Sequence, residues 1–290
     1  MTHEYGRLSD DEGAPLLRIW ETRVSPGIRP LDRHSHISFE IAAVREGGGV
    51  YTVGAREYQI LPGAVFVFSS NEQHYVTEIG PSGLCIVNLH FEPRYLWGRR
   101  QDRLSDRHAN FCFAHGPHFE NRIPPEKAAS LRGAVLRMAE ELAEKREEYA
   151  LQVKGILDGV LVELIRSHGY ADGAAPEEGG RQRFLRDCVR YIDAHFAEKL
   201  TLAVLAQRAG MSPNYFSAAF HAACGMTLWD YIQARRVEAA MGLLRGDVSR
   251  NILDVAISCG FNNTANFNKV FRKKTGMTPG EYRARRDAWL

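Results

Sequence analysis

The hydrophobic positions along the chain follow two different periods. From about Pro15 to Pro93, short runs rich in β-branched and aromatic residues, such as AVFVF and LCIVNLHF, are mostly separated by glycine or proline. Several short strands at this spacing predict an all-β sandwich or barrel rather than a βαβ unit. From residue 126 to residue 168 the period becomes helical, which predicts two amphipathic helices after the β-rich region.

Each of these two predicted helices has an apolar stripe. The first stripe comprises Leu131, Val135, Met138 and Leu142, and the second comprises Val153, Ile156, Leu157, Val160, Leu161 and Leu164. Two roles stay open for the stripes. They pair two copies of the chain as a homodimer, or they pack on the strands of their own chain.

The next segment, GYADGAAPEEGGRQ, has four glycines and one proline and predicts an interdomain linker. Everything after it is helical by pattern. The predicted organisation is therefore α+β with two domains. A sensing β-barrel (1–125) and a helical dimerisation segment (126–169) precede a linker (170–182) and an all-α domain (183–290).

The all-α region contains an internal duplication. The stretches Leu202–Thr227 and Ile252–Pro279 are similar to each other at a period of 50–51 residues. Each copy predicts a short helix, a turn at Gly210 or Gly260, and a second helix, which is the pattern of a helix-turn-helix unit. The second helix is capped by Ser212 in the first copy, and by Asn262 or Asn263 in the second.

Two phenylalanines four residues apart must face inward in the second helix of each copy, which fixes the residues that face outward. These are Asn214, Ser217, Ala218 and His221 in the first copy, and Ala265, Asn268, Lys269 and Arg272 in the second. A helix in the major groove needs side chains that hydrogen-bond base edges, flanked by cations for phosphates. Lys273 and Lys274 are predicted to add phosphate contacts.

The charge of the chain is unevenly distributed about Gly180. Residues 181–290 contain 17 basic and 9 acidic residues, a net charge of +8, whereas residues 1–180 carry −6. A basic surface alone is weak evidence for a polyanion partner. Together with the duplicated helical units it indicates double-stranded DNA.

The all-α region resembles the DNA-binding domain of the AraC/XylS family of transcription regulators. The matching positions include Leu205-Ala206, Gly210, Tyr231-Ile232, Gly260-Phe261 and Thr278-Pro279. The resemblance implies a regulator, either an activator or a repressor, that binds promoter DNA as a homodimer and responds to a small-molecule effector. A sugar is the expected class of effector, and RNA polymerase is a further candidate partner. The chain departs from the family pattern in one respect, because its first recognition helix has no lysine or arginine. We therefore expect the second copy to supply more of the electrostatic affinity, with Ala218 offering at most a contact to a thymine methyl group.

The β-rich half resembles a cupin, a jelly-roll barrel. His34, His36, Glu40 and His74 follow the spacing of the two cupin motifs, although Ser69 and Asn71 depart from the second motif. Three imidazoles and one carboxylate suit a divalent first-row ion such as Zn, Ni, Mn or Fe. The favoured interpretation, which AraC-type sensors imply, is instead that the same four side chains line the effector pocket, with an occupied metal site as the alternative. His90 is interpreted as a strand residue rather than a ligand.

Two function classes follow from these patterns. The favoured hypothesis is a ligand-responsive transcription regulator with no catalytic residues. The alternative is a metal-dependent cupin enzyme with a helical appendage. Five scattered cysteines, no apolar run near ~18 residues and no secretion signal predict a cytoplasmic protein without a membrane partner.

Overall fold

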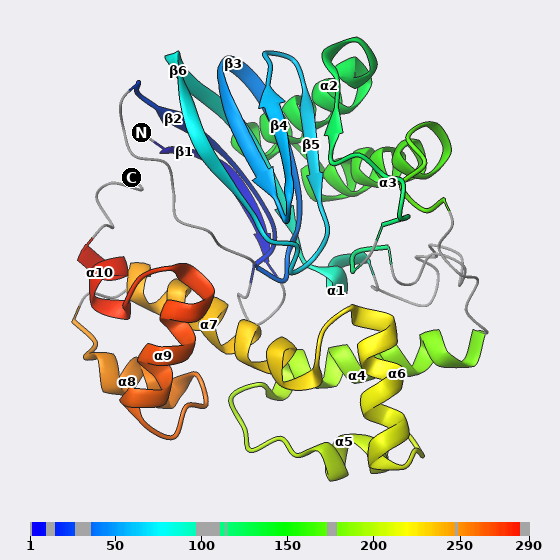
Figure 1. Ribbon diagram of the computed structural model, residues 1–290, viewed down its shortest axis with the longest axis vertical. Helices are drawn as coiled ribbons and strands as arrows, with labels where there is room; N and C mark the ends of the chain where they lie inside the picture. The colour runs from blue at the N-terminus through cyan, green and yellow to red at the C-terminus, as the bar shows by residue number, and fades with distance from the viewer. Residues whose placement is uncertain are drawn as a thin grey trace.

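A β-rich upper part and a helical lower part make up the chain in Figure 1. The computed structural model describes residues 2–9, 15–26, 36–96, 111–113, 115–172, 179–246 and 249–284. The strands are β1 (Thr2–Ser9), β2 (Pro15–Val24), β3 (Phe39–Val53), β4 (Arg56–Ile60), β5 (Val65–Phe68), β6 (His74–Phe91) and β7 (Arg122–Ile123). The helices that follow the strands or lie among them are α1 (Pro93–Leu96), α2 (Pro125–Glu144) and α3 (Tyr149–Ser167).

All the described strands belong to one antiparallel sheet. Its order is β1-β2-β6-β3-β5-β7, and β4 pairs with the far end of β3. This confirms the β-rich N-terminal domain. Closure of the sheet into a cupin-like jelly-roll barrel stays a prediction, because the pairing leaves β1 and β7 at the two ends of the order.

The two longest strands, β3 and β6, bend together in the middle of the sheet. Their register shifts between Val44 and Glu46 and again between Gly47 and Gly49. Gly47 has φ +78°, and a Cβ added there would lie 2.0 Å from the carbonyl oxygen of Gly83. Glycine is therefore required at this position, since it alone combines a left-handed backbone with so close an approach.

The bent sheet has a different apolar core on each face. Successive side chains of a strand point to opposite faces. On β3, Ile41 and Ala43 belong to the core that α2 shares, whereas Ala42 and Val44 belong to a second core with aromatic residues of β5. Glu40 alternates with Ile41, so it lies on the same face as the second core.

Both apolar stripes predicted for residues 126–168 are buried within the one chain. The first stripe lies on α2 and joins the core of the sheet. The second lies on α3, which packs against α2, and all its members are buried except the partly buried Ile156. Packing on the strands of the same chain is therefore the alternative that the structure shows. Pairing of two chains stays a prediction.

The C-terminal part contains only helices among its described residues. They are α4 (Gly179–His195), α5 (Leu202–Arg208), α6 (Pro213–Cys224), α7 (Leu228–Gly246), α8 (Ile252–Ser258), α9 (Thr264–Thr275) and α10 (Pro279–Ala284). The duplication is visible in the helix lengths, because α5 and α8 both have 7 residues and α6 and α9 both have 12. None of the helices in the described ranges is both long and apolar enough to cross a membrane.

Helix α7 lies between the two repeats (Figure 1) and takes part in two separate cores. Its first half, through Tyr231 and Ile232, joins a continuous core with α4, α6 and the sheet domain. Its second half, from Val237 onward, packs with α8, α9 and α10 in a core that contains no residue of the sheet. The first helix-turn-helix unit is thus packed with the sensor half, whereas the second has a core of its own.

Candidate functional site

Two helix-turn-helix units form the first part of the candidate site. The turn residues Gly210 and Gly260 have φ of +64° and +82°, as the left-handed turn requires. Ser212 Oγ accepts a hydrogen bond from the backbone N–H of Tyr215, and Asn263 Oδ1 accepts one from Asn266. Of the two capping residues considered for the second copy, Asn263 is therefore the one that caps α9.

The predicted outward faces of α6 and α9 are exposed. This holds for the four residues Asn214, Ser217, Ala218 and His221 on α6. It also holds for Ala265, Asn268, Lys269, Arg272 and Lys273 on α9. The inward phenylalanines of both helices are fully buried, which fixes the rotation of each helix about its axis.

Lys274 does not share this exposed face. Its side chain is partly buried, and the pKa of its ammonium group is lowered by that burial, with the carboxylates of Asp230 and Glu238 opposing the shift. Both carboxylates belong to α7. Lys274 therefore lies beside the joining helix rather than on the open side of α9, and its contact with a phosphate stays a prediction.

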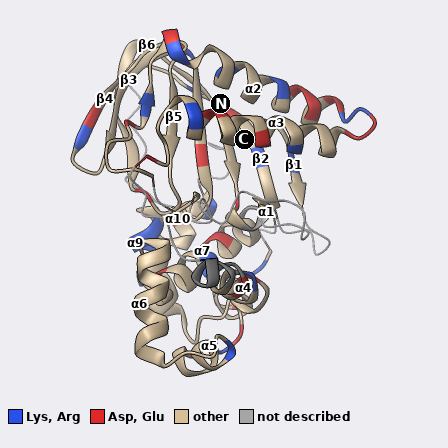
Figure 2. Cartoon of the chain, turned by 90° about the vertical axis from the view of Figure 1, so that its right-hand side faces the viewer, with Lys and Arg blue, Asp and Glu red and all other residues tan. Residues whose placement is uncertain are grey.

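The two recognition helices differ in charge. Figure 2 shows Lys and Arg on α9, whereas α6 contains no Lys, Arg, Asp or Glu and has His221 in its last turn. The exposed cations of α9 are Lys269, Arg272 and Lys273. Cations on an exposed face contact phosphates, so this difference supports the expectation that α9 supplies more electrostatic affinity than α6.

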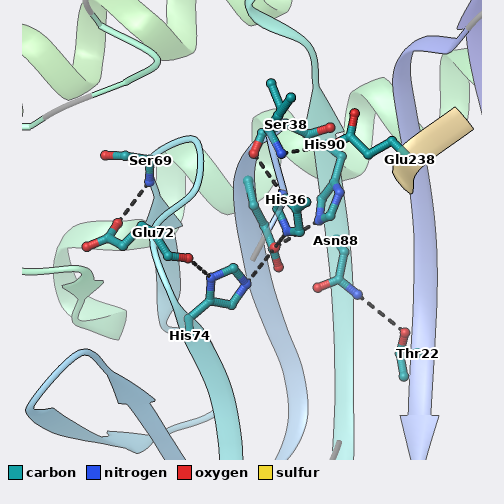
Figure 3. Close-up of polar contacts among 11 residues, drawn as sticks. Thr22, His36, Ser38, Ser69, Glu72, His74, Asn88, His90 and Glu238 are labelled. Carbon is teal, nitrogen blue, oxygen red and sulfur yellow. Dashed lines mark hydrogen bonds and ion pairs between the residues drawn. The ribbon is translucent and has the colours of Figure 1, made fainter. Parts of the chain in front are cut away.

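A buried cluster of histidines around one glutamate forms the second part of the site, inside the bent sheet (Figure 3). The Oε2 atom of Glu40 lies 2.9 Å from Nε2 of His36, 3.0 Å from Nε2 of His74 and 2.8 Å from Nε2 of His90. The ring of Phe68 stacks on His74 with centroids 3.9 Å apart. Three of the four predicted residues therefore meet, and His34 lies outside the described residues.

His90 is the member of the cluster that the sequence interpretation missed. It is a strand residue, as expected, but it also lies directly opposite Glu40 in the pairing of β3 with β6. Residues opposite each other on one face of an antiparallel pair are close enough to interact. The interpretation of His90 as a strand residue is confirmed, and the sequence interpretation did not include its contact with Glu40, which depends on strand register.

Burial and mutual contact shift the pKa values in the cluster in opposite directions. For Glu40, burial raises the pKa of the carboxyl group, but the charges of His90 and His74 and hydrogen bonds from the imidazoles outweigh it and leave that pKa well below its ordinary value. Burial lowers the pKa of His36, yet its contact with Glu40 raises it overall. Burial and the neighbouring His36 lower the pKa of His90 to about 4.

The cluster is joined to the helical domain by a buried polar network. The backbone N–H of Ile37, next to His36, donates to Oε1 of Glu238 on α7 at 2.7 Å. Arg235, one turn earlier on α7, contacts Glu238 at 2.8 Å, Glu92 after β6 at 2.6 Å and Asp193 on α4 at 3.0 Å. Arg235 is 7% exposed, so these ion pairs are shielded from water. Sheet, α4 and α7 therefore meet at one guanidinium group.

Both parts of the chain, the sheet domain and the two helix-turn-helix units, match families of known proteins. The family model of the AraC-like ligand binding domain matches residues 29–161, and that of a helix-turn-helix domain matches residues 205–285. The chain belongs to the AraC family of transcription regulators. The HTH-type transcriptional activator RhaR of Escherichia coli strain K12 is 25% identical to this AraC-family chain over 256 residues, which are 86% of each protein.

Solved structures of ToxT from Vibrio cholerae have the same fold. One crystal form superposes with a TM-score of 0.63 at 10% identity and covers 93% of this chain and 98% of ToxT. Another, with an unsaturated fatty acid bound, gives a TM-score of 0.60 at 12% identity and covers 96% of each chain. Two predictions are therefore confirmed: an N-terminal β-sheet domain followed by a helical domain with helix-turn-helix units, and a transcription regulator with a ligand-binding domain. RhaR is named as a transcriptional activator, which gives no support to the enzyme alternative.

Proposed function

We propose that this AraC-family protein activates transcription when an effector binds the sheet domain beside the His36, Glu40, His74 and His90 cluster. The observation that carries the proposal is the buried network from Ile37 through Glu238 to Arg235. A change at the cluster shifts the segment that precedes β3. That segment is hydrogen-bonded to α7, which packs against both helix-turn-helix units. Effector binding in the sheet domain is thereby coupled to the position of the DNA-binding helices.

On the DNA side, α6 and α9 enter successive major-groove segments about one turn of DNA apart, roughly 34 Å. Lys269, Arg272 and Lys273 neutralise phosphates along α9, and Asn268 reaches base edges. Activation is supported by the name of RhaR, an activator. We further propose a cytoplasmic homodimer that contacts RNA polymerase, as the family resemblance implies.

On the effector side, Trp20 provides an aromatic wall next to the cluster. Its ring meets that of His90 edge-on at 4.5 Å between centroids, and the guanidinium of Arg18 lies 4.9 Å from its centroid. Aromatic rings beside hydrogen-bonding groups bind small polar metabolites. A saccharide therefore stays our predicted class of organic effector, whereas ToxT has been solved with an unsaturated fatty acid.

The test is fluorescence anisotropy of the full chain on its own promoter fragment, with and without candidate saccharides and carboxylic acids. We expect specific binding at low salt and a change in affinity of about 5- to 150-fold with the effector. Glu238→Gln removes the charge at the centre of the network and is expected to reduce that ratio toward one. Glu147→Gln, at an exposed position between α2 and α3, serves as the matched control. Failure to bind any promoter fragment at low salt would refute the proposed function.

A further inference from the structure

The two helix-turn-helix units have the same turn but different surroundings. The backbone N–H of Gly210 donates to the carbonyl oxygen of Gln207 at 3.0 Å, and that of Gly260 donates to Ile257 at 2.9 Å. A Cβ atom added at Gly210 would meet nothing within 4 Å. One added at Gly260 would lie 2.6 Å from the carbonyl oxygen of Ala197 and 2.8 Å from its Cα atom. The second turn therefore needs glycine for a further reason, which is the close approach of the chain at Ala197.

Ala197 is attached to the first helix-turn-helix unit and not to the second. It lies in the loop between α4 and α5, the helix that begins the first unit. Further along this loop, Leu200 is buried in the core that α4, α6 and the sheet domain share, and its backbone N–H donates to the carbonyl oxygen of Glu198 at 3.0 Å. The loop is therefore fixed to the first unit. Its contact with Gly260 brings the two units together directly, although their apolar cores are separate.

Arg236 of α7 holds this loop against the second turn. Its Nε donates to the carbonyl oxygen of Phe196 at 2.8 Å, and its Nη2 donates to that of Glu198 at 2.9 Å. The two hydrogen bonds therefore flank Ala197. The guanidinium group also lies 5.9 Å from the ring centroid of Phe261, the residue after the turn glycine. A guanidinium group is planar and presents its donors in a fixed fork. The first unit, the joining helix and the second turn thus meet at this one side chain.

We propose that Arg236 and Gly260 fix the separation and the relative orientation of α6 and α9, so that the chain reads two DNA segments at a single spacing. Helix α7 connects the two units (Figure 1), and each unit packs on it through a core of its own. The contacts at Arg236 and Gly260 are a second connection between the same two bodies, which prevents one from turning relative to the other. This inference rests on the proposed function and deepens it on the DNA side.

A fixed spacing has a measurable consequence for DNA selection. One base pair inserted between the two segments moves the second segment by about 3.4 Å along the helix axis and turns it by about 35°. A rigid pair of helices cannot follow this change, so one of them loses its base contacts. A good bidentate base contact alone is worth roughly tenfold in affinity. We therefore expect the wild-type chain to bind the lengthened site at least about tenfold more weakly than the original site. A chain without the contacts of Arg236 should lose less.

The first experiment selects binding sites for the untagged full chain from random DNA duplexes about three helical turns long. Fluorescence anisotropy then compares the selected duplex with the same duplex lengthened by one base pair between the two contacted segments. Arg236→Met is expected to reduce the affinity ratio of the two duplexes from at least about tenfold to below about threefold. An unchanged ratio in Arg236→Met would overturn the proposal.

The affinity ratio separates a positioning role of Arg236 from a merely structural one. A loss of stability alone weakens the binding of both duplexes equally and leaves their ratio unchanged. Arg208→Met is the matched control, because the guanidinium group of Arg208 on α5 lies over the ring of Tyr191 on α4, 3.8 Å from its centroid. This contact joins two helices on the side of the first unit, so Arg208→Met is expected to keep the wild-type ratio.

Two glycine substitutions test the same contact if Arg236→Met does not fold. Asparagine tolerates the left-handed backbone that both turns require. Gly260→Asn places a side chain against Ala197 and is expected to lower the affinity ratio below about threefold. Gly210→Asn faces open space and is expected to keep the wild-type ratio. Equal ratios in the two variants would contradict the proposal, as would a wild-type chain that binds both duplexes equally well. Recovery of no duplex at all would refute the proposed function instead.

Discussion

Replacing Arg235 by methionine removes the guanidinium group at which the sheet domain, α4 and α7 meet. The substitution keeps a long unbranched side chain but leaves the carboxylates of Glu92, Asp193 and Glu238 without their common cation. Two of the carboxylates are 9% and 5% exposed, so water cannot replace the lost partner.

The size of the effect follows from the desolvation of these carboxylates. Removing one partner from a buried ion pair costs about 3–5 kcal/mol, because the remaining charge stays buried and uncompensated. We therefore expect Arg235→Met to lower the free energy of unfolding by about that amount at pH 7.5. Burial already raises the pKa of the Glu238 carboxyl group against the opposing charge of Arg235, so this pKa rises further above its unfolded value when Arg235 is removed. The folded state then takes up more protons than the unfolded state, so part of the lost stability returns as the pH falls toward 5.

Urea unfolding followed by circular dichroism at pH 7.5 and 5.5 measures this effect. The midpoint is expected to fall by about 1 M or more at pH 7.5, and by less at pH 5.5. Arg146→Met is the control, because Arg146 forms ion pairs on the surface with Glu144 and is 56% exposed. An exposed pair contributes little, about 0–1 kcal/mol. A loss at Arg235 no larger than that at Arg146, or one that does not depend on pH, would refute the reasoning.

Two further predictions concern stability. Burial lowers the pKa of His115, but its hydrogen bond to Glu72 outweighs burial and leaves that pKa raised. The contact therefore stabilises the folded state fully below the ordinary pKa of about 6.5. This stabilisation is lost as the pH rises through the pKa of His115 in the folded state. The stability difference between wild type and His115→Gln should therefore shrink from pH 6 to pH 9 in urea titrations, and a difference that grows would contradict this. Gly47→Ala is expected to cost about 2 kcal/mol or more because of its left-handed backbone and the carbonyl of Gly83. A Cβ at Gly155 on α3 meets open space, so Gly155→Ala should instead stabilise the chain by about 0.5–1 kcal/mol in thermal unfolding. Equal changes in stability for Gly47→Ala and Gly155→Ala would contradict this prediction.

The helical half could be predicted from the sequence in detail, because its signals are local. The spacing of Phe267 and Phe271 sets the rotation of α9, and with it the exposure of Lys269 and Arg272. Lys274 is the exception, since its burial depends on α7, a neighbour that the helical period does not include.

The sheet half was less predictable because its site depends on contacts between distant residues. His36 and Glu40 are four residues apart and were found from their spacing. His90 joins them only through the register of β3 with β6, which a single sequence does not reveal. In the same way, Ile37 and Glu238 are 201 positions apart, so no local pattern predicts their hydrogen bond.

The most direct test of the account is the salt dependence of promoter binding by the full chain, measured by anisotropy at pH 8. Each phosphate contact contributes about 0.9 to the slope of log affinity against log salt. We predict that Lys269→Ala reduces the slope by about 0.9, and that His221→Ala on the uncharged face of α6 leaves it unchanged. A larger reduction of the slope in His221→Ala than in Lys269→Ala would contradict the account. So would the absence of promoter binding by the wild-type chain at low ionic strength.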